Sequence, residues 1–205
     1  MRNIIFAWLI LLAGCRHPAD KLRVGIQPIG QVSKGKVELV KRALGAAYNT
    51  NIVVLTPVNP PHDAFVNFKT PRYRADKLIA WLKFNKPDSL DYVMGITELD
   101  VSTTKRNTDG AVKEPKSRYE DFGIFGLGYM PGVSSVVSSF RLGSDEALMY
   151  ERLAKICVEE LGHNLILDHC ANKKCVMTDA VERMTTIDNA EKSLCDGCRR
   201  KVGWR

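Results

Sequence analysis

The 205-residue sequence lacks several features that would define a class at once. It has no internal repeat, no arginine-rich arm and no cluster of aromatic and basic residues, and its net charge of +7 is spread along the chain. Diffuse positive charge is more typical of a solvated surface than of a nucleic-acid interface, so we expect no nucleic-acid partner. Hydrophobic residues make up 45% of the chain. This content excludes disordered and collagen-like classes and suits one globular domain with a sizeable core.

The apolar run near the start, Ile4 to Leu12, is too short to span a bilayer as a mature helix. Placed after Arg2, it is typical of a signal-peptide core. It leads into Leu-Ala-Gly-Cys, which resembles the lipobox of bacterial lipoproteins and implies removal of residues 1–14 and lipidation of Cys15. An ordinary cleaved signal peptide and a start codon assigned too early are the alternatives. We therefore expect an exported, membrane-anchored lipoprotein of the cell envelope, with residues 15–20 as a tether.

From residue 21 onward, strands alternate with helices. The hydrophobic pattern predicts strands within residues 22–30, 51–58 and 89–101, with the second strand buried, and helices in residues 33–49 and 70–86. Ser33 is expected to cap the first helix. Residues 122–142 predict two short strands around the turn at Met130-Pro131-Gly132. Such alternation favours an α/β fold with a mixed, mainly parallel sheet and helices packed on it.

The last third of the chain has a different character. A long helix is expected over residues 144–165 with Ser144 as its N-cap, so the single domain, 21–205, divides into a sheet-and-helix part, 21–143, and a second part, 144–205. The second part contains a C-x(4)-C pair, Cys170 and Cys175, and a C-x(2)-C pair, Cys195 and Cys198. Two short-spaced pairs suit tetrahedral zinc, but exported thiols are often oxidised. Spacing alone therefore leaves zinc and two disulfides open.

The segment EELGHNLILDHC, residues 159–170, is close to the zinc-binding helix H-E-x-x-H. In that motif, two histidines one helical turn apart point the same way, and the glutamate between them acts as general base beside the metal. Glu160 and His163 occupy the second and last positions, and His169 follows. Glu159 stands where the first histidine would be.

Taken with the cysteines, the segment resembles the archaemetzincin pattern H-E-x-x-H-x-x-G-x-x-H-C-x(4)-C-x-M-x(17)-C-x-x-C. Every spacing fits, through Glu159, Glu160, His163, Ile166, His169, Cys170, Cys175, Met177, Cys195 and Cys198. Weaker similarities lie upstream in PRYRADKLI, MGITELDV and FGLGYMPG.

This resemblance implies a metzincin-like metallopeptidase fold that acts on peptides, and we expect a monomer. Glu160 would be the general base, and His163, His169 and Glu159 would hold a catalytic zinc above the Met-turn residue Met177. The four cysteines would hold a structural zinc. The resemblance also implies an edge strand that pairs with extended substrate, which we expect in residues 133–140.

Two departures fall at the catalytic site. A carboxylate at Glu159 can ligate zinc but makes it a weaker Lewis acid, and its repulsion of Glu160 favours a proton on one of them. Ile166 replaces a glycine that lets the chain turn out of the helix. A β-branched residue in the required left-handed conformation is strained by about 1–2 kcal/mol. The position of His169 then depends on a bend at Asn164 or Asp168, or on Ile166 tolerating it.

Three functions follow as hypotheses. In the first, the chain is a zinc peptidase whose activity is impaired by the two departures. Alternatively, it is a catalytically inactive binding or scaffold lipoprotein that keeps only the structural zinc, or a disulfide-stapled module without metal. Outside the motif, we expect Cys157 to be a buried helix residue and His62 to be exposed.

Overall fold

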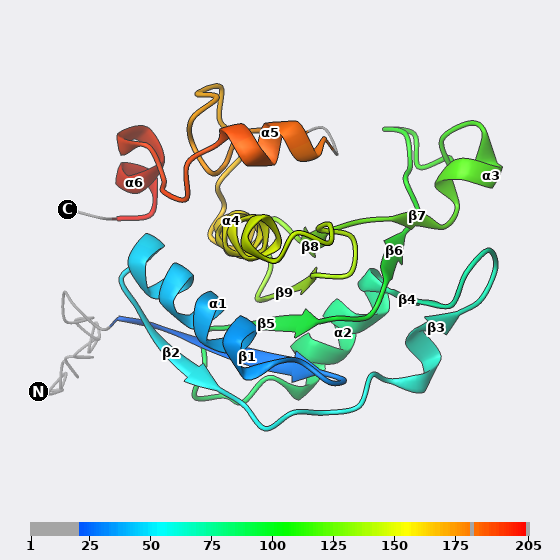
Figure 1. Cartoon of the computed structure of the whole chain (residues 1–205), viewed down its shortest axis with the longest axis horizontal. Coiled ribbons are helices and arrows are strands. Elements are labelled where there is room, and N and C mark those ends of the chain that lie inside the picture. The colour runs from blue at the N-terminus through cyan, green and yellow to red at the C-terminus, as the bar shows by residue number, and fades with distance from the viewer. Residues whose placement is uncertain (1–20, 181–182, 204–205) are drawn as a thin grey trace, which may run out of the picture.

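The computed structural model describes residues 21–180 and 183–203, which form a five-stranded sheet with helices on both faces (Figure 1). The strands are β1 (Leu22–Ile29), β2 (Thr50–Val54), β5 (Tyr92–Thr97), β8 (Gly126–Gly128) and β9 (Ser134–Ser138), in the order β2-β1-β5-β9-β8. The first four strands in this order run parallel, and β8 is antiparallel to β9. The expected α/β fold with a mixed, mainly parallel sheet is confirmed.

The two faces of the sheet carry different helices. The main helices are α1 (Lys34–Ala47), α2 (Ala75–Asn85) and α4 (Glu146–Asn164). Because successive strand residues point to opposite faces, Met94 and Val137 join the core formed with α1 and α4, whereas Val93 and Val136 join the core formed with α2. Figure 1 shows α1 and α4 on one side of the sheet and α2 on the other.

The helix starts follow local chemistry. The Ser33 hydroxyl accepts a hydrogen bond from the Lys36 N–H at 3.4 Å and caps α1 as expected. The cap of α4 is Asp145 rather than Ser144, because its carboxylate accepts from the Leu148 N–H at 2.9 Å. The second helix begins only at Ala75, since the preceding residues form strand β4 (Arg72–Arg74).

Two expectations about strands were wrong. Residues 51–58 do not form a buried strand, because β2 lies at the edge of the sheet and is partly exposed. Residues 133–140 do not form an edge, because β9 lies between β5 and β8 with all its residues buried. The free edge beside α4 therefore belongs to β8, on the other side of the turn.

A second, smaller sheet was not expected from the sequence. It contains β3 (Phe65–Val66), β4, β6 (Val101–Thr103) and β7 (Phe122–Gly123). A buried ion network joins it to the main sheet: Arg141 makes two hydrogen bonds of 2.6 Å to Asp100, which lies 3.2 Å from Arg72. Arg72 also lies 3.2 Å from Asp121. The network fixes the segment that leads into β7 and β8.

The remaining elements are short. They are the 3₁₀ turn η1 (His62–Ala64), α3 (Lys116–Tyr119), α5 (Met184–Asn189) and α6 (Asp196–Lys201). The last two lie in the cysteine-rich part, and neither was predicted from the sequence. Within residues 21–180 and 183–203, no helix has the length and apolar character needed to cross a bilayer. The expected signal peptide, Cys15 and the tether lie outside the described residues.

Candidate metal centre and cleft

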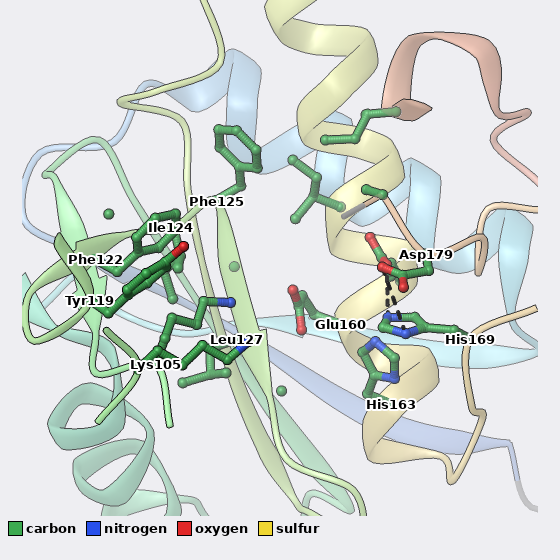
Figure 2. Close-up of a pocket in the computed structure, with 18 residues that line it drawn as sticks. Lys105, Tyr119, Phe122, Ile124, Phe125, Leu127, Glu160, His163, His169 and Asp179 are labelled. Atoms are coloured by element: carbon green, nitrogen blue, oxygen red, sulfur yellow. Dashed lines mark ion pairs between the residues drawn. The ribbon is translucent and has the colours of Figure 1, made fainter. Parts of the chain in front are cut away.

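The last turns of α4 carry the first three residues of the motif. Glu159 and His163 are one turn apart and share a helix face, and Glu160 lies beside them facing strand β8. The spacing of the motif therefore places a carboxylate and an imidazole on one side of the helix, as the sequence predicted. Figure 2 shows Glu160 and His163 projecting from this helix into one pocket.

Ile166 makes the turn that ends α4. Its φ of 65° is the one positive value at a non-glycine position among the described residues. The Ile166 N–H donates to the His163 carbonyl at 3.0 Å, and the Leu167 N–H donates to the Gly162 carbonyl at 2.9 Å. These two bonds form a Schellman motif, in which a left-handed residue closes the helix and the next residue packs onto it. Leu167 is accordingly buried, and Ile166 itself tolerates the bend.

The turn brings His169 back to the helix. Its ring centroid lies 4.9 Å from that of His163, and its Nε2 lies 3.7 Å from Oε1 of Glu159. Potential ligand atoms of all three residues lie within 4.8 Å of one another. Zinc with bonds of about 2.0–2.2 Å separates its ligand atoms by roughly 3.3–3.6 Å, so this set fits one zinc ion with a slight contraction.

The two imidazoles present corresponding nitrogens to this centre. Nδ1 of His163 lies 2.9 Å from the Leu167 carbonyl oxygen, so it carries the proton and leaves Nε2 as the ligand atom. Nδ1 of His169 faces Oδ1 of Asp179 at 4.0 Å. Burial lowers the pKa of His163, which favours the neutral ring that binds metal.

Glu159 combines burial with neighbouring negative charge. Its side chain is 14% exposed. Desolvation, followed by the charge of Asp179, raises its pKa to about 8. Without a cation the carboxyl group is therefore mostly protonated at neutral pH, and a metal ion would have to displace that proton to bind.

Glu160 is held against β8 by two glycines. A Cβ on Gly126 would lie 2.6 Å from Oε1 of Glu160, and a Cβ on Gly128 would lie 2.6 Å from its backbone oxygen. Only glycines allow the strand to approach the helix this closely. Desolvation and the charge of Glu159 raise the pKa of Glu160 well above its usual value. These surroundings favour a proton on at least one of the two adjacent acids, in line with the expectation from the sequence.

The four cysteines form a second cluster behind the helix. Their sulfurs lie within 4.8 Å of one another, and two of the distances, Cys170 to Cys195 and Cys175 to Cys198, are both 3.8 Å. Tetrahedral zinc with four bonds of about 2.3 Å separates its sulfurs by about 3.8 Å, whereas a disulfide requires about 2.05 Å. The four thiols are free and have the arrangement of a zinc site rather than of two disulfides.

Met177 packs directly beneath the helix. It is fully buried, and its sulfur occupies the space that a side chain at position 162 would need. The Tyr48 hydroxyl fills the rest of that space and donates to the Val158 carbonyl at 2.7 Å. Gly162 therefore permits α4 to lie on Met177 and Tyr48 together.

The pocket in front of the acids and histidines has a volume of about 580 Å³. The opposite wall is mostly apolar and runs from α3 through β7 to β8. Its side chains are those of Tyr119, Phe122, Ile124, Phe125 and Leu127 (Figure 2). Lys105, from the loop after β6, also lines this wall. The arrangement is a cleft with an apolar wall and a polar floor, whose acids and histidines have the spacing of metal ligands.

Sequence reasoning missed several residues of this site. Asp179 gave no signal, because an isolated acid after the methionine has no motif of its own. The glycines of FGLG were noticed only as a weak similarity, and their contact with Glu160 depends on the pairing of β8 with β9. Two other expectations hold: Cys157 is fully buried, and His62 is exposed and does not line the cleft.

Comparisons with known proteins agree on one family. The model of peptidase family M54 matches residues 34–203. An archaemetzincin of Halobacterium salinarum is 29% identical over 191 residues, covering 88% of this chain and 99% of the relative. One from Haloquadratum walsbyi is 29% identical over 187 residues, covering 86% and 97%.

Solved structures show the same fold. Archaemetzincin from Archaeoglobus fulgidus, crystallised with malonate, matches with a TM-score of 0.69 and 24% identity over 88% of this chain and 99% of that one. The archaemetzincin from Methanopyrus kandleri matches with a TM-score of 0.71 and 22% identity, covering 89% and 93%. These likenesses support the metzincin-like architecture expected from the motif.

Proposed function

The chain belongs to peptidase family M54, the archaemetzincins, which are zinc-dependent, and we propose that it is a slow peptidase with one catalytic and one structural zinc. The observation that carries this proposal is the convergence of Glu159, His163 and His169 beneath a cleft despite the strained turn at Ile166. The turn brings His169 to the two residues on the helix, and the three side chains together have the spacing of a metal site. The substrate would be a peptide, as the family implies.

Each residue has a distinct role in the proposed reaction. Zinc held by Glu159, His163 and His169 would supply a Lewis acid for the scissile carbonyl and for the attacking water. Glu160 takes the proton of the attacking water and returns it to the leaving amine. Glu159, His163 and His169 hold the metal, and the free edge of β8 offers backbone groups to an extended peptide.

Reduced turnover follows from the charge of Glu159. An anionic ligand cancels part of the metal charge that a neutral histidine would leave intact, so the scissile carbonyl is polarised less. Burial and the charge of Glu159 also raise the pKa of Glu160, so less of the protein holds Glu160 as the carboxylate that a general base requires. We therefore place the activity below that of a site with three histidines.

Metal content tests the proposal directly. The purified mature protein should contain two zinc ions, and His163→Ala and Cys195→Ser should each lose one. Peptidase activity should disappear in Glu160→Gln, which keeps the shape of the side chain but cannot act as a base. One zinc that is indifferent to His163→Ala would show that the helix binds no metal, and activity that survives Glu160→Gln would come from a contaminant.

A second candidate is a peptide-binding protein that keeps only the structural zinc. It is favoured by the grouping of Glu159, Glu160 and Asp179, which discourages proton transfer without preventing a peptide from occupying the cleft. This candidate predicts that peptides bind but are recovered intact, with one zinc per chain.

The prediction of export and anchoring rests on residues 1–15 alone. We propose that the chain is cut before Cys15 and lipidated there, so that residues 15–20 tether a single, monomeric domain to the membrane. Mass spectrometry of the N-terminal peptide from the native membrane fraction tests this, and Cys15→Ser should release the protein from that fraction.

A further inference from the structure

His169 is the least enclosed of the three metal-binding candidates. Its side chain is 48% exposed, and it lies in an extended segment after the helix rather than on a regular element. An imidazole in such a position can rotate and exchange its two nitrogens. A ring that is to bind metal through one nitrogen needs a partner for the other.

An acid lies near each nitrogen of this ring. Nε2 lies 3.7 Å from Oε1 of Glu159, and Nδ1 lies 4.0 Å from Oδ1 of Asp179. Figure 2 shows Asp179 beside His169. The pattern repeats that of His163, whose Nδ1 faces the Leu167 carbonyl. In both rings, Nδ1 points outward to an oxygen acceptor and Nε2 is left for the centre.

The main chain keeps Asp179 near His169. The Cys170 N–H donates to the Met177 carbonyl at 2.7 Å, and residues 170 and 178 form a parallel β-bridge. The Thr178 N–H donates to the Cys175 carbonyl at 2.9 Å, and the residue is buried. Because residues 169 and 179 each adjoin this bridge, their side chains are kept together by the main chain that also carries the cysteine cluster.

From this geometry we propose that Asp179 is a positioning residue, which accepts the Nδ1 proton of His169 and so directs Nε2 to the catalytic metal. The inference rests on the metal site of the proposed function. Closing the 4.0 Å separation to hydrogen-bond length requires only a small movement of an exposed ring. A carboxylate in this role fixes the tautomer and raises the basicity of the ligating nitrogen.

The same geometry gives a reason for placing two acids so close together. Glu159 and Asp179 lie beside the His169 ring and repel each other, which is unfavourable in a metal-free site. A divalent cation bound by Glu159 and His169 offsets that repulsion. The arrangement thus adds a second carboxylate to the centre without using it as a direct ligand.

Zinc affinity of the full-length protein tests the role of Asp179. With the cysteine site loaded, competition against a chromophoric chelator measures the dissociation constant of the second zinc. Asp179→Ala should weaken it by about 10–100-fold. Asp179→Asn should weaken it less, because the amide oxygen still accepts from Nδ1. Asp168→Asn is the matched control, since it removes one exposed charge next to His169, and its affinity should remain unchanged.

A second readout separates orientation from folding. The chain has four histidines, so their ¹⁵N resonances can be assigned and report which nitrogen of His169 carries zinc. Nε2 should be bound in the wild type, and a mixture should appear in Asp179→Ala while the unfolding midpoint stays the same. Unchanged affinity and tautomer in Asp179→Ala would overturn the role of Asp179 alone. A wild-type protein that binds no second zinc would overturn the proposed function and this role with it.

Discussion

The rings of His163 and His169 stand 4.9 Å apart and nearly perpendicular, at 77°, although a continued helix would have put them on different faces. The chain turns between them at Ile166, where a β-branched residue adopts φ 65°. The side chain of Ile166 is 66% exposed, so little burial offsets the strain of this conformation.

Replacing Ile166 with glycine should stabilise the protein. Glycine adopts the left-handed conformation without strain, and we expect the free energy of unfolding to rise by about 1 kcal/mol after its greater chain entropy is counted. Chemical denaturation measures the change. Leu165→Gly is the control, because Leu165 has φ −84° and gains nothing from glycine. Equal effects at both positions would contradict strain at Ile166.

The glycines of β8 should resist substitution. Gly128→Ala brings a Cβ to 2.6 Å from the backbone oxygen of Glu160, so the strand or the helix must shift. We expect a loss of about 2 kcal/mol or more in stability and lower peptidase activity, because Glu160 moves. Gly45→Ala provides the contrast: this position in α1 has no neighbour within 4 Å. There, alanine should stabilise the helix by about 0.5–1 kcal/mol.

The features that could be predicted depend on residues that lie close together in the sequence. The alternation of strands and helices and the cap at Ser33 follow from hydrophobic spacing and hydrogen bonding near in sequence. The spacing from Glu159 to Cys198 likewise indicated which residues converge, because a helix turn and short loops fix their separation. None of these features depends on contacts between residues that are far apart in the sequence.

The remaining features depend on pairing between distant segments. Residues 133–140 were expected at the edge, but which of two adjacent strands becomes the edge depends on pairing with β5, far earlier in the chain. The small sheet escaped prediction because its strands have only two or three residues each. Asp179 could be recognised only after the bridge between residues 170 and 178 had placed it beside His169.

The buried ion network should be costly to break. Asp100 is the shared partner of Arg72 and Arg141, and its side chain is 4% exposed. Asp100→Ala leaves both arginines without that carboxylate, so we expect a loss of about 3–5 kcal/mol. Glu38→Gln removes an exposed partner of Lys41 and should change stability by about 0.5 kcal/mol or less. Thermal unfolding distinguishes them, and a small effect at Asp100 would show that the network is dispensable.

The Arg152–Asp188 pair should make stability depend on acid. Two hydrogen bonds of 2.7 Å from Arg152 lower the pKa of Asp188. A lowered folded-state pKa gives stability that is present above the unfolded value of about 4 and is lost as pH falls through the folded value. Asp188→Asn should therefore cost about 1 kcal/mol at pH 7, and less below pH 4. Asp63→Asn, in a pair 4.0 Å apart with both side chains exposed, should show no such difference.

Replacing Glu159 with histidine should increase the turnover of a peptide substrate. Glu159 and His163 already share the helix face, so the imidazole of Glu159→His can reach the metal from the same turn. The substitution removes one negative charge next to Glu160 and Asp179, which leaves the metal a stronger Lewis acid. We expect kcat/KM on a peptide to rise by about tenfold, equivalent to about 1.4 kcal/mol in the barrier. Glu159→Gln is the contrasting variant, because it removes the same charge but supplies a poor zinc ligand. It should lose the second zinc and show no rise in kcat/KM. If Glu159→His binds two zinc ions and still cleaves no peptide, the limitation lies beyond Glu159, and the non-catalytic reading of the cleft would replace the proposed one.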